Sequence, residues 1–297
     1  MDVYLIDGTY ELFRHFFAVP PARDDGGREI GAVRGVVASL VGMIAEGATH
    51  LGVATDHVIE SFRNDLYAGY KTGAGIDPLL RSQFEPLEEA LRQLGVRVWA
   101  MVDEEADDAL ASAAQKAASD PTAGRIFICS PDKDLAQCVR DSRVLQLDRR
   151  KRLVMDAAAV RERFGVDPES IPDFLALVGD NADGFPGLPG WGARSAATIL
   201  AEYGHLESIP RDASDWRVRV RGAERLAWTL GERRDEALLF RRLATLRTDI
   251  PVFDSVEDLR WRGPRPEFEA LCRSMRAERL WERAVLLDTS DGPDPVP

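Results

Sequence analysis

The sequence predicts an α/β protein with a mostly parallel central sheet, followed by a helical C-terminal region. Two observations carry this prediction. In the first half of the chain, short apolar segments typical of buried strands alternate with segments of helical periodicity. That alternation is typical of a parallel sheet covered by helices. After about Asp156 the pattern becomes helical.

The predicted elements of the first half follow one another in a regular order. Helices are expected from about Thr9, over 32–45 and over 79–94, and an alanine-rich helix over about 109–118. The four predicted strands cover residues 4–6, 50–55, 96–101 and 125–130.

The second half is predicted to begin with a β-ribbon around the basic turn Arg149-Arg150-Lys151-Arg152. An apolar helix is expected over 171–178, and another begins near Arg194. Residues 257–287 read as a small mixed element, and Gly292 to Pro297 are expected to fray.

The composition is that of a soluble globular protein, with 297 residues of which 45% are hydrophobic and 30% charged. The N-terminus lacks the features of a signal peptide, and no run approaches the length of a membrane span. The three cysteines are odd in number and lack metal-binding spacing. They fit a reducing cytoplasm, so we expect a cytoplasmic protein with no membrane partner.

The most acidic stretch is Asp103-Glu104-Glu105-Ala106-Asp107-Asp108, between the third strand and the alanine-rich helix. Acids in a first helical turn interact favourably with the helix dipole. However, carboxylates three or four residues apart repel each other, and capping does not need so many. Hard divalent cations do take several oxygen ligands. The run by itself therefore leaves a capped helix and a metal site equally open.

Three further acids, Asp7, Asp56 and Asp132, follow predicted strands. Each alone is more often a turn or capping residue. Yet the carboxyl ends of parallel strands meet at one edge of a sheet, where ligands bind. The coincidence of these acids with the acidic helix start therefore favours a metal site.

A second unusual segment begins with Asp180 and Asp183 and continues with four glycines and two prolines within residues 184–192. A glycine turn that leads into a helix presents free backbone N–H groups, which suit a phosphate. The alternative is a glycine-rich helical hairpin without a ligand.

Together these motifs resemble the 5′-nuclease superfamily, which includes the 5′-nuclease domain of bacterial DNA polymerase I, phage 5′ exonucleases and flap endonucleases. The resemblance extends from Leu5 to about Leu246, and without a polymerase domain the chain resembles a stand-alone bacterial member. The matching blocks, in the family's order, are Ile6-Asp7-Gly8, Asp56, Phe62-Arg63 with Tyr70-Lys71, Glu105 to Asp108, Asp132-Lys133-Asp134-Leu135, and Gly179-Asp180 through Gly192.

The resemblance implies a PIN-like (resolvase-like) nuclease core over residues 1–170, with a helical arch at about 70–94. It also implies a C-terminal helical region over 171–290, packed on the core. That region would contain a helix-three-turn-helix module, at about Leu188 to Leu200, which grips duplex DNA and carries a K⁺ ion.

The resemblance also implies the site residues. Two Mg²⁺ or Mn²⁺ ions would be held by Asp7, Asp56, Glu105, Asp107, Asp108, Asp132, Asp134, Asp180 and Asp183, and every one of these positions is acidic here. Lys71 and Arg63 would be catalytic cations at the phosphate. The DNA-binding residues would be Phe13, Arg14, Tyr70, Gly187, Gly190, Gly192, Arg194 and Ser195.

Four positions depart from the family pattern. Phe13 stands where relatives usually have a tyrosine, and stacking on a base and a core role are both open for it. Ala74 stands where relatives often have an arginine, so the arch has fewer cations. Ala193 replaces an acid, and Arg194 replaces a lysine.

The net charge of −12 at first argues against nucleic acid. Nine of those negative charges belong to the implied metal site, however, so the rest of the chain has a net charge of only −3. The implied function is that of a metal-dependent 5′→3′ exonuclease and 5′-flap endonuclease. It would act as a monomer, in the bacterial nucleoid, on DNA with 5′ ends, flaps or nicks, including RNA-primed duplex.

Two alternatives are a 5′ nuclease that prefers RNA or RNA–DNA hybrids, and a non-catalytic binder of branched DNA. Nine clustered acids argue against the binder, because they repel a polyanion unless metals are present.

Overall fold

The computed structural model describes residues 1–288, so the expectation for Gly292 to Pro297 lies outside the described residues. The chain divides into two compact units. Unit 1 comprises Met1–Ile59, Gly73–Cys129 and the chain from Asp249, and unit 2 comprises Glu60–Thr72 and Ser130–Thr248. The division expected near residue 170 stays a prediction, since these units follow spatial contacts and each combines segments distant in sequence.

Unit 1 is built on four parallel strands in the order β3-β2-β1-β4. Most of their residues are buried, which explains why the strands are apolar on both faces. All four predicted strands are confirmed to within two residues at each end, and so is the mostly parallel α/β organisation. The strands are β1 (Val3–Asp7), β2 (His50–Asp56), β3 (Arg97–Met101) and β4 (Ile126–Cys129).

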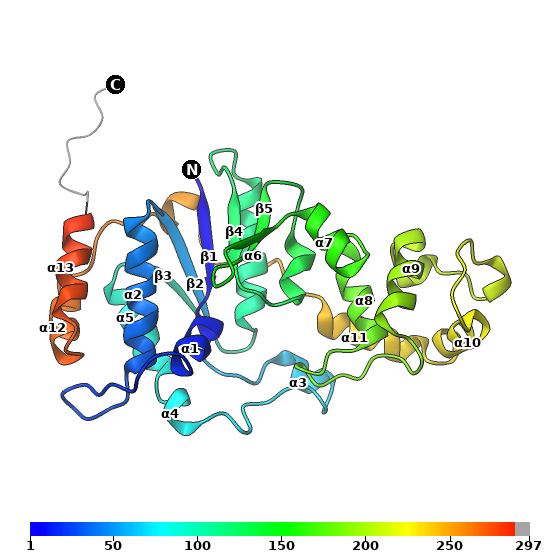
Figure 1. Ribbon diagram of the computed structural model, residues 1–297, viewed down its shortest axis with the longest axis horizontal. Coiled ribbons are helices and arrows are strands. Elements are labelled where there is room, and N and C mark those ends of the chain that lie inside the picture. The colour runs from blue at the N-terminus through cyan, green and yellow to red at the C-terminus, as the bar shows by residue number, and fades with distance from the viewer. Residues whose placement is uncertain (289–297) are drawn as a thin grey trace. The chain divides into compact units, whose positions relative to one another are not determined.

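Helices surround this sheet (Figure 1). Helix α6 packs on all four strands, whereas α1 contacts β2 and α5 contacts β3. Because α6 leads from β3 back to β4, against the direction from β1 to β3, right-handed crossovers place it on the opposite face from α1 and α5. The helices of this part are α1 (Gly8–Phe16), α2 (Gly31–Ala45), α4 (Pro78–Arg81), α5 (Phe84–Gln93) and α6 (Ala106–Ser119).

The single helix predicted over 79–94 is wrong, because the chain forms α4 and α5 with a break at Ser82–Gln83. In a continuous helix, the ring of Pro86 would clash with the carbonyl of Ser82. The helix therefore restarts so that the proline falls in its first turn. Gln83, fully buried in the break, accepts hydrogen bonds at its Oε1 from the N–H groups of Ala32 (3.1 Å) and Val33 (3.3 Å).

The C-terminal element expected to be mixed is helical and belongs to unit 1. It consists of the 3-10 turn η5 (Val256–Leu259) and the helices α12 (Glu267–Ser274) and α13 (Glu278–Leu287). The segment before α12 is held by indole N–H groups: Trp99 donates to the Val252 carbonyl, and Trp261 donates to the Leu94 carbonyl, both at 2.7 Å.

Unit 2 is mainly helical, and its core includes the stacked rings of Phe185 and Phe240, with centroids 5.6 Å apart. The predicted ribbon is confirmed as an antiparallel hairpin of β5 (Val144–Asp148) and β6 (Leu153–Met155). Its helices are α3 (Phe62–Leu66), α7 (Ala157–Phe164), α8 (Ile171–Val178), α9 (Ala193–Tyr203), α10 (Ala223–Glu232) and α11 (Arg234–Ala244), with 3-10 turns η1 (Asp134–Cys138), η2 (Pro168–Ser170), η3 (Leu206–Ser208) and η4 (Ala213–Asp215).

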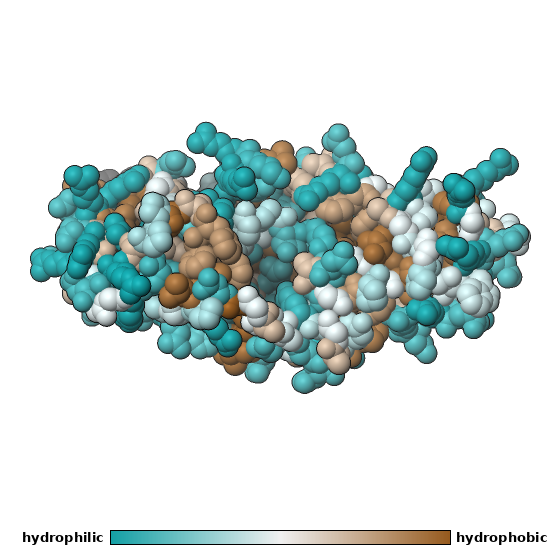
Figure 2. Space-filling view, turned by 60° about the horizontal axis from the view of Figure 1, so that its bottom comes forward, coloured by the Kyte–Doolittle hydropathy of each residue, from teal (hydrophilic) through white to brown (hydrophobic). Residues whose placement is uncertain are grey.

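None of the helices within residues 1–288 is both long and apolar enough to cross a membrane. On the face shown in Figure 2, hydrophilic side chains cover most of the surface and apolar residues form smaller patches between them.

Candidate active site

In unit 1, two of the predicted acids end neighbouring parallel strands. Asp7 ends β1 and caps α1, where its Oδ1 accepts a hydrogen bond from the Tyr10 N–H at 2.8 Å. Asp56 ends β2, and its Oδ1 accepts from the Ala106 N–H at 2.8 Å. Its own N–H donates to Thr9 Oγ1, also at 2.8 Å. The Asp56 carboxylate thereby joins the end of β2 to the start of α6, and the Asp56 N–H joins it to α1 through Thr9.

The acidic run forms the start of α6. Glu105 is the N-cap residue and is buried, and its N–H donates to Asp108 Oδ2 at 3.1 Å. Asp108 is fully buried, Asp107 is half-buried and Asp103 is exposed. Asp108 Oδ2 therefore acts as a capping acceptor at the start of α6, and this capping role is compatible with metal binding by the same carboxylate. Metal binding by these acids stays a prediction.

In unit 2, three predicted acids come together. The carboxylates of Asp134, Asp180 and Asp183 are all buried, and each offers an oxygen within 4.8 Å of the others. The loop that carries two of them is closed by hydrogen bonds between the backbones of Asp180 and Phe185, at 2.8 and 3.0 Å. We refer to Asp134, Asp180 and Asp183 as the acid trio.

Two lysines hold the acid trio. The Lys71 ammonium lies 2.8 Å from Asp183 Oδ1, and the Lys71 N–H donates to the Asp183 carbonyl at 2.9 Å. The Lys133 ammonium pairs closely with Asp180 and lies 3.9 Å from Asp134 Oδ1. Burial by itself would lower the pKa of Lys133, but its bond to Asp180 and the charges of the nearby acids raise it overall.

The environment of Asp134 fits a cation. Burial, together with the carboxylates of Asp132 and Asp183, raises the pKa of Asp134 well above its usual value, and the Lys133 ammonium offsets only part of this. Asp134 Oδ1 is buried and makes no hydrogen bond with any residue in 1–288. Such an oxygen among crowded carboxylates suits a hard divalent cation, which would supply the missing positive charge.

Asp132 is exposed, and its backbone position is fixed by neighbours. Its Oδ1 accepts from the Asp134 N–H at 2.9 Å. The buried Gln146 of β5 donates to the carbonyl of Ser130 at 2.9 Å and closely to that of Asp132. Gln146 is absent from the predicted site residues, and its only signal in the sequence is a polar residue inside an apolar strand. Lys133 is part of a matching block but has no predicted role, although the acid–base–acid pattern at 132–134 could have suggested one.

Arg63 lies in a different environment from the one expected. Its side chain is almost fully buried, with Nε donating to the Leu243 carbonyl at 2.8 Å and Nη2 to the Thr245 carbonyl at 3.2 Å. These bonds hold the C-terminal end of α11. The placement favours a structural role over the phosphate contact predicted from the resemblance.

The residues near the N-terminus and the arch that were predicted to contact DNA also make contacts within the protein. Phe13 is half-buried and packs edge-on against Phe84, with centroids 6.3 Å apart. Arg14 pairs closely with the buried Glu11. Tyr70 belongs to the core of unit 2. Base stacking by Phe13 or Tyr70 stays a prediction.

The glycine-rich segment forms turns between α8 and α9, as predicted. Gly187 has a φ of +70°, and a Cβ there would lie 2.3 Å from the backbone nitrogen of Gly179, so only glycine fits. Gly192 caps α9, where its N–H donates to Ser195 Oγ at 3.1 Å. Gly190 and Arg194 are exposed beside this helix start, whose first turn contains no acid.

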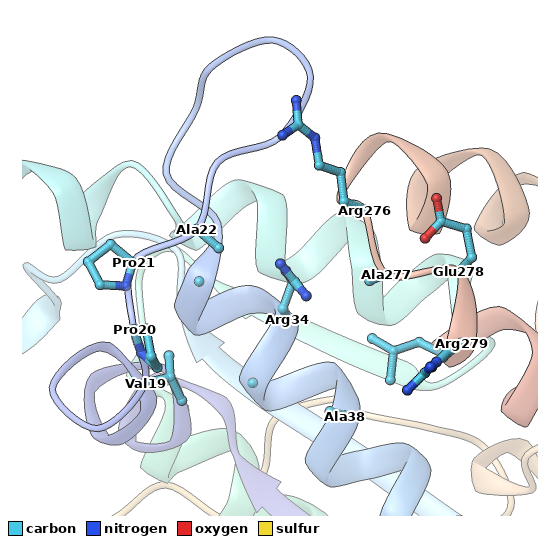
Figure 3. A pocket seen from close by; sticks show the side chains of 13 residues that line it. Val19, Pro20, Pro21, Ala22, Arg34, Ala38, Arg276, Ala277, Glu278 and Arg279 are labelled. Atoms are coloured by element: carbon cyan, nitrogen blue, oxygen red, sulfur yellow. The ribbon is translucent and has the colours of Figure 1, made fainter.

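Unit 1 also has an open hollow of about 640 Å³ beside α2 and the start of α13, with Arg34 and Arg279 along it (Figure 3). None of the predicted site residues lines it.

The α/β fold and the buried acid trio are compatible with a metal-dependent hydrolase, and the family comparisons identify the class as a nuclease. Residues 2–165 match the family described as 5′-3′ exonuclease, N-terminal resolvase-like domain, and residues 166–267 match 5′-3′ exonuclease, C-terminal SAM fold. The chain therefore belongs to the 5′-3′ exonuclease family.

Individual relatives agree with this assignment. The chain is 33% identical over 265 residues to the 5′-3′ exonuclease of Aquifex aeolicus, covering 88% of this chain and 87% of that protein. It is 35% identical over 266 residues to DNA polymerase I of Pseudomonas aeruginosa, covering 86% of this chain but only 28% of the polymerase. The chain thus spans about a quarter to a third of the polymerases that it matches.

Solved structures share the fold. T5 5′-exonuclease with bound divalent metal ions (zinc) matches with a TM-score of 0.66 at 18% identity, covering 96% of this chain and all of that one. The catalytic core of Rad2 in complex with DNA substrate matches with a TM-score of 0.62 at 15% identity, covering 96% and 91%. The predicted fold class and the predicted family are both confirmed.

Proposed function

We propose that this protein is a divalent-metal-dependent 5′→3′ exonuclease and 5′-flap endonuclease that hydrolyses DNA phosphodiester bonds. Its work would be the removal of RNA primers and flaps in replication and repair, in the cytoplasm of a bacterium. The single observation that carries the proposal is the buried acid trio, in which Asp134 Oδ1 makes no hydrogen bond with any residue from 1 to 288. Membership of the 5′-3′ exonuclease family supports the substrate class.

We assign the acid trio to Mg²⁺ or Mn²⁺, because small hard cations prefer carboxylate oxygens. By resemblance, we assign the same role to Asp132 and to the unit 1 acids Asp7, Asp56, Glu105, Asp107 and Asp108. When bound, a pair of such ions supplies an activated water and neutralises charge on the phosphate.

The chain's own groups prepare this chemistry. Lys71 brings an ammonium to the acid trio, where it can neutralise a phosphate oxygen as negative charge develops. Lys133 limits the repulsion among the carboxylates and so keeps them together. Gln146 holds the backbone that carries Asp132. Arg63 is left out of the catalytic set because it is committed to the carbonyls of α11.

DNA binding is assigned to unit 2. The start of α9 presents a helix N-terminus without acids, and Arg194 adds an exposed cation, both suited to a phosphate of duplex DNA. We also propose a K⁺ ion at the turns of residues 187–192 and action as a monomer.

The test is a cleavage assay in Mg²⁺ and in EDTA on labelled 5′-flap, nicked, blunt and RNA-primed duplexes. We expect Mg²⁺-dependent cleavage at 5′ ends and flaps, and its loss in Asp132→Ala and Asp107→Ala. Asp103→Ala, which removes an exposed acid outside the assigned set, is the matched control. Cleavage restricted to RNA or hybrid strands would support an RNA-directed nuclease instead, and binding without cleavage would support a non-catalytic binder. Full activity of the two acid variants would contradict the metal assignment.

A further inference from the structure

The exposed face of α10 carries an unusual side chain. Trp228 is 67% exposed, although its helix buries Leu226, Ala227 and Leu230 on the other side. Tryptophan has a large apolar surface, and exposed tryptophans are enriched where a partner covers them. Trp228 is the largest of the exposed hydrophobic side chains in the described part of the chain.

An arginine lies on the same face. Arg225 precedes Trp228 by three residues, so the two side chains are neighbours on the helix surface. The Arg225 guanidinium also lies against the glycine turn before α9, because a Cβ on Gly190 would be 2.7 Å from Arg225 Nη2. This contact places the Arg225 side chain of α10 beside the turn that precedes α9.

Arg225 has no ionic partner among residues 1–288, unlike three other arginines of the same segment. Arg217, Arg233 and Arg241 all form ion pairs with glutamates. Arg225 forms no ion pair or hydrogen bond with any residue from 1 to 288, and it is exposed. Its charge is thus available to an anion at the same turn to which we assign DNA phosphate.

The charge of this face selects the kind of ligand. Within α10 itself the exposed charged residues are Arg225, Glu224 and Glu232, so the surface of this helix carries no excess of positive charge. A surface without excess positive charge does not bind a long run of DNA phosphates strongly, because affinity for the phosphate backbone grows with the number of Lys and Arg contacts. Stacking of a base on Trp228 would then contribute more to the binding free energy than the single phosphate contact of Arg225. A base exposes its face for stacking only where it is unpaired.

We propose that Arg225 and Trp228 form a subsite for an unpaired nucleotide of the nucleic-acid substrate, with the base stacked on Trp228 and its phosphate on Arg225. The proposal rests on the proposed function, since it adds a single-strand contact to the duplex-binding turn of unit 2.

The experiment is equilibrium binding of the full chain in EDTA, where cleavage does not occur, to two fluorescent DNA probes. One is a blunt duplex, and the other is the same duplex with a single-stranded 5′ extension. We expect Trp228→Ala to weaken binding of the extended probe roughly tenfold, and that of the blunt probe by less than about threefold. Trp228→Phe should retain most of the affinity. Arg225→Ala should make binding of the extended probe less dependent on salt concentration, by the amount expected for about one lost phosphate contact.

Leu286→Ala, at an 85% exposed site in unit 1, is the matched control and should bind both probes as the wild type does. Trp228→Gln provides a second variant, and thermal melting checks the fold of each. Equal binding of the extended probe by wild type and Trp228→Ala would overturn the proposal, as would equal losses on both probes. Loss of self-association in Trp228→Ala with unchanged DNA binding would also overturn it, in favour of a protein contact.

Cleavage of a 5′-flap substrate by the wild-type chain in Mg²⁺ is measured in parallel. Its absence would contradict the proposed function, whereas the dependence of binding on Trp228 decides the subsite independently.

Discussion

The acids of the two units differ in the positive groups that surround them. In unit 1, Asp7, Asp56 and Asp108 accept hydrogen bonds from backbone N–H groups at strand and helix ends. In unit 2, the acid trio is crowded and is paired with the ammonium groups of Lys71 and Lys133, although Asp180 Oδ1 also accepts a hydrogen bond from the Ala182 N–H at 2.9 Å. The first group therefore contributes to folding through its caps, whereas the second group carries electrostatic repulsion that a cation would relieve.

The comparison shows why a carboxylate in a site cannot be assigned from its residue type alone. A buried carboxylate that accepts backbone hydrogen bonds is stable in its charged form. A buried carboxylate beside other carboxylates is stable only with a positive counter-charge. The four predictions below test this difference, beginning with the largest expected effect.

The largest effect is expected on cleavage, from Asp180→Ala in the acid trio. Because this change removes a proposed metal ligand, we expect activity on a 5′-flap duplex in Mg²⁺ to fall by more than the roughly 10–100-fold typical of outer-shell partners. The measurement is single-turnover cleavage with a thermal melt of each variant. Asp148→Ala, in the hairpin of the same unit, serves as a control. Retention of wild-type rates would remove the acid trio from the site.

The next effect is expected on stability, from Arg63→Ala. The change leaves the carbonyls of Leu243 and Thr245 without their buried donor and creates a cavity, so we expect a loss of about 3 kcal/mol or more. Urea unfolding of the variant measures this loss, with Arg219→Ala, at an exposed site of the same unit, as the control. If stability is unchanged and only cleavage is lost, the catalytic role first predicted for Arg63 is correct.

A direct comparison of the two groups uses Asp108→Ala, Asp108→Asn and Asp134→Asn in EDTA. Asp108→Ala removes the acceptor for the Glu105 N–H, so we expect a loss of about 0.5–2 kcal/mol, whereas asparagine keeps an acceptor oxygen and should lose less. Asp134→Asn removes a crowded charge and should raise the melting temperature by a few degrees.

The same samples with added Mg²⁺ provide the second half of that test. Wild-type protein should gain stability from the ion, and Asp134→Asn should gain less because it has lost a carboxylate. A lower melting temperature for Asp134→Asn in EDTA would mean that the acid trio is not under repulsive strain.

The smallest effect concerns Glu207, a carboxylate of unit 2 that does have a strong cationic partner. Its hydrogen bonds to Arg241, both 2.6 Å long, lower the pKa of Glu207 to about 2. The pKa is depressed on folding, so the stabilisation is complete above about pH 4.5 and is lost as the pH falls towards 2. Since Glu207 is about half exposed, solvent screening limits the contribution to a few tenths of a kcal/mol.

Unfolding of wild type and Glu207→Gln by urea, over pH 2 to 7, measures this contribution. The two curves should differ at neutral pH and converge at the acid end. A difference that persists at pH 2 would mean that the Arg241 contact does not depend on the charge of Glu207.

Much of the fold could be predicted because its signals are local. The strands of unit 1 are apolar on both faces, and Asp7 and Asp56 end two of them, so strand positions and acid positions followed from periodicity alone. The break at Ser82–Gln83 could have been predicted too, since a helix accepts Pro86 only in its first turn, but the amphipathic pattern concealed it.

The sequence by itself determined the α/β class, the order of the strands and helices, and the set of acids at the ends of elements. Only the tertiary structure decided which acids are caps and which are crowded, because Asp134 meets Asp180 and Asp183 through chain closure over more than forty residues. It also decided the place of Arg63, whose carbonyl partner at Leu243 is 180 residues away. Such partners depend on packing between distant segments, and no local pattern of residues encodes them.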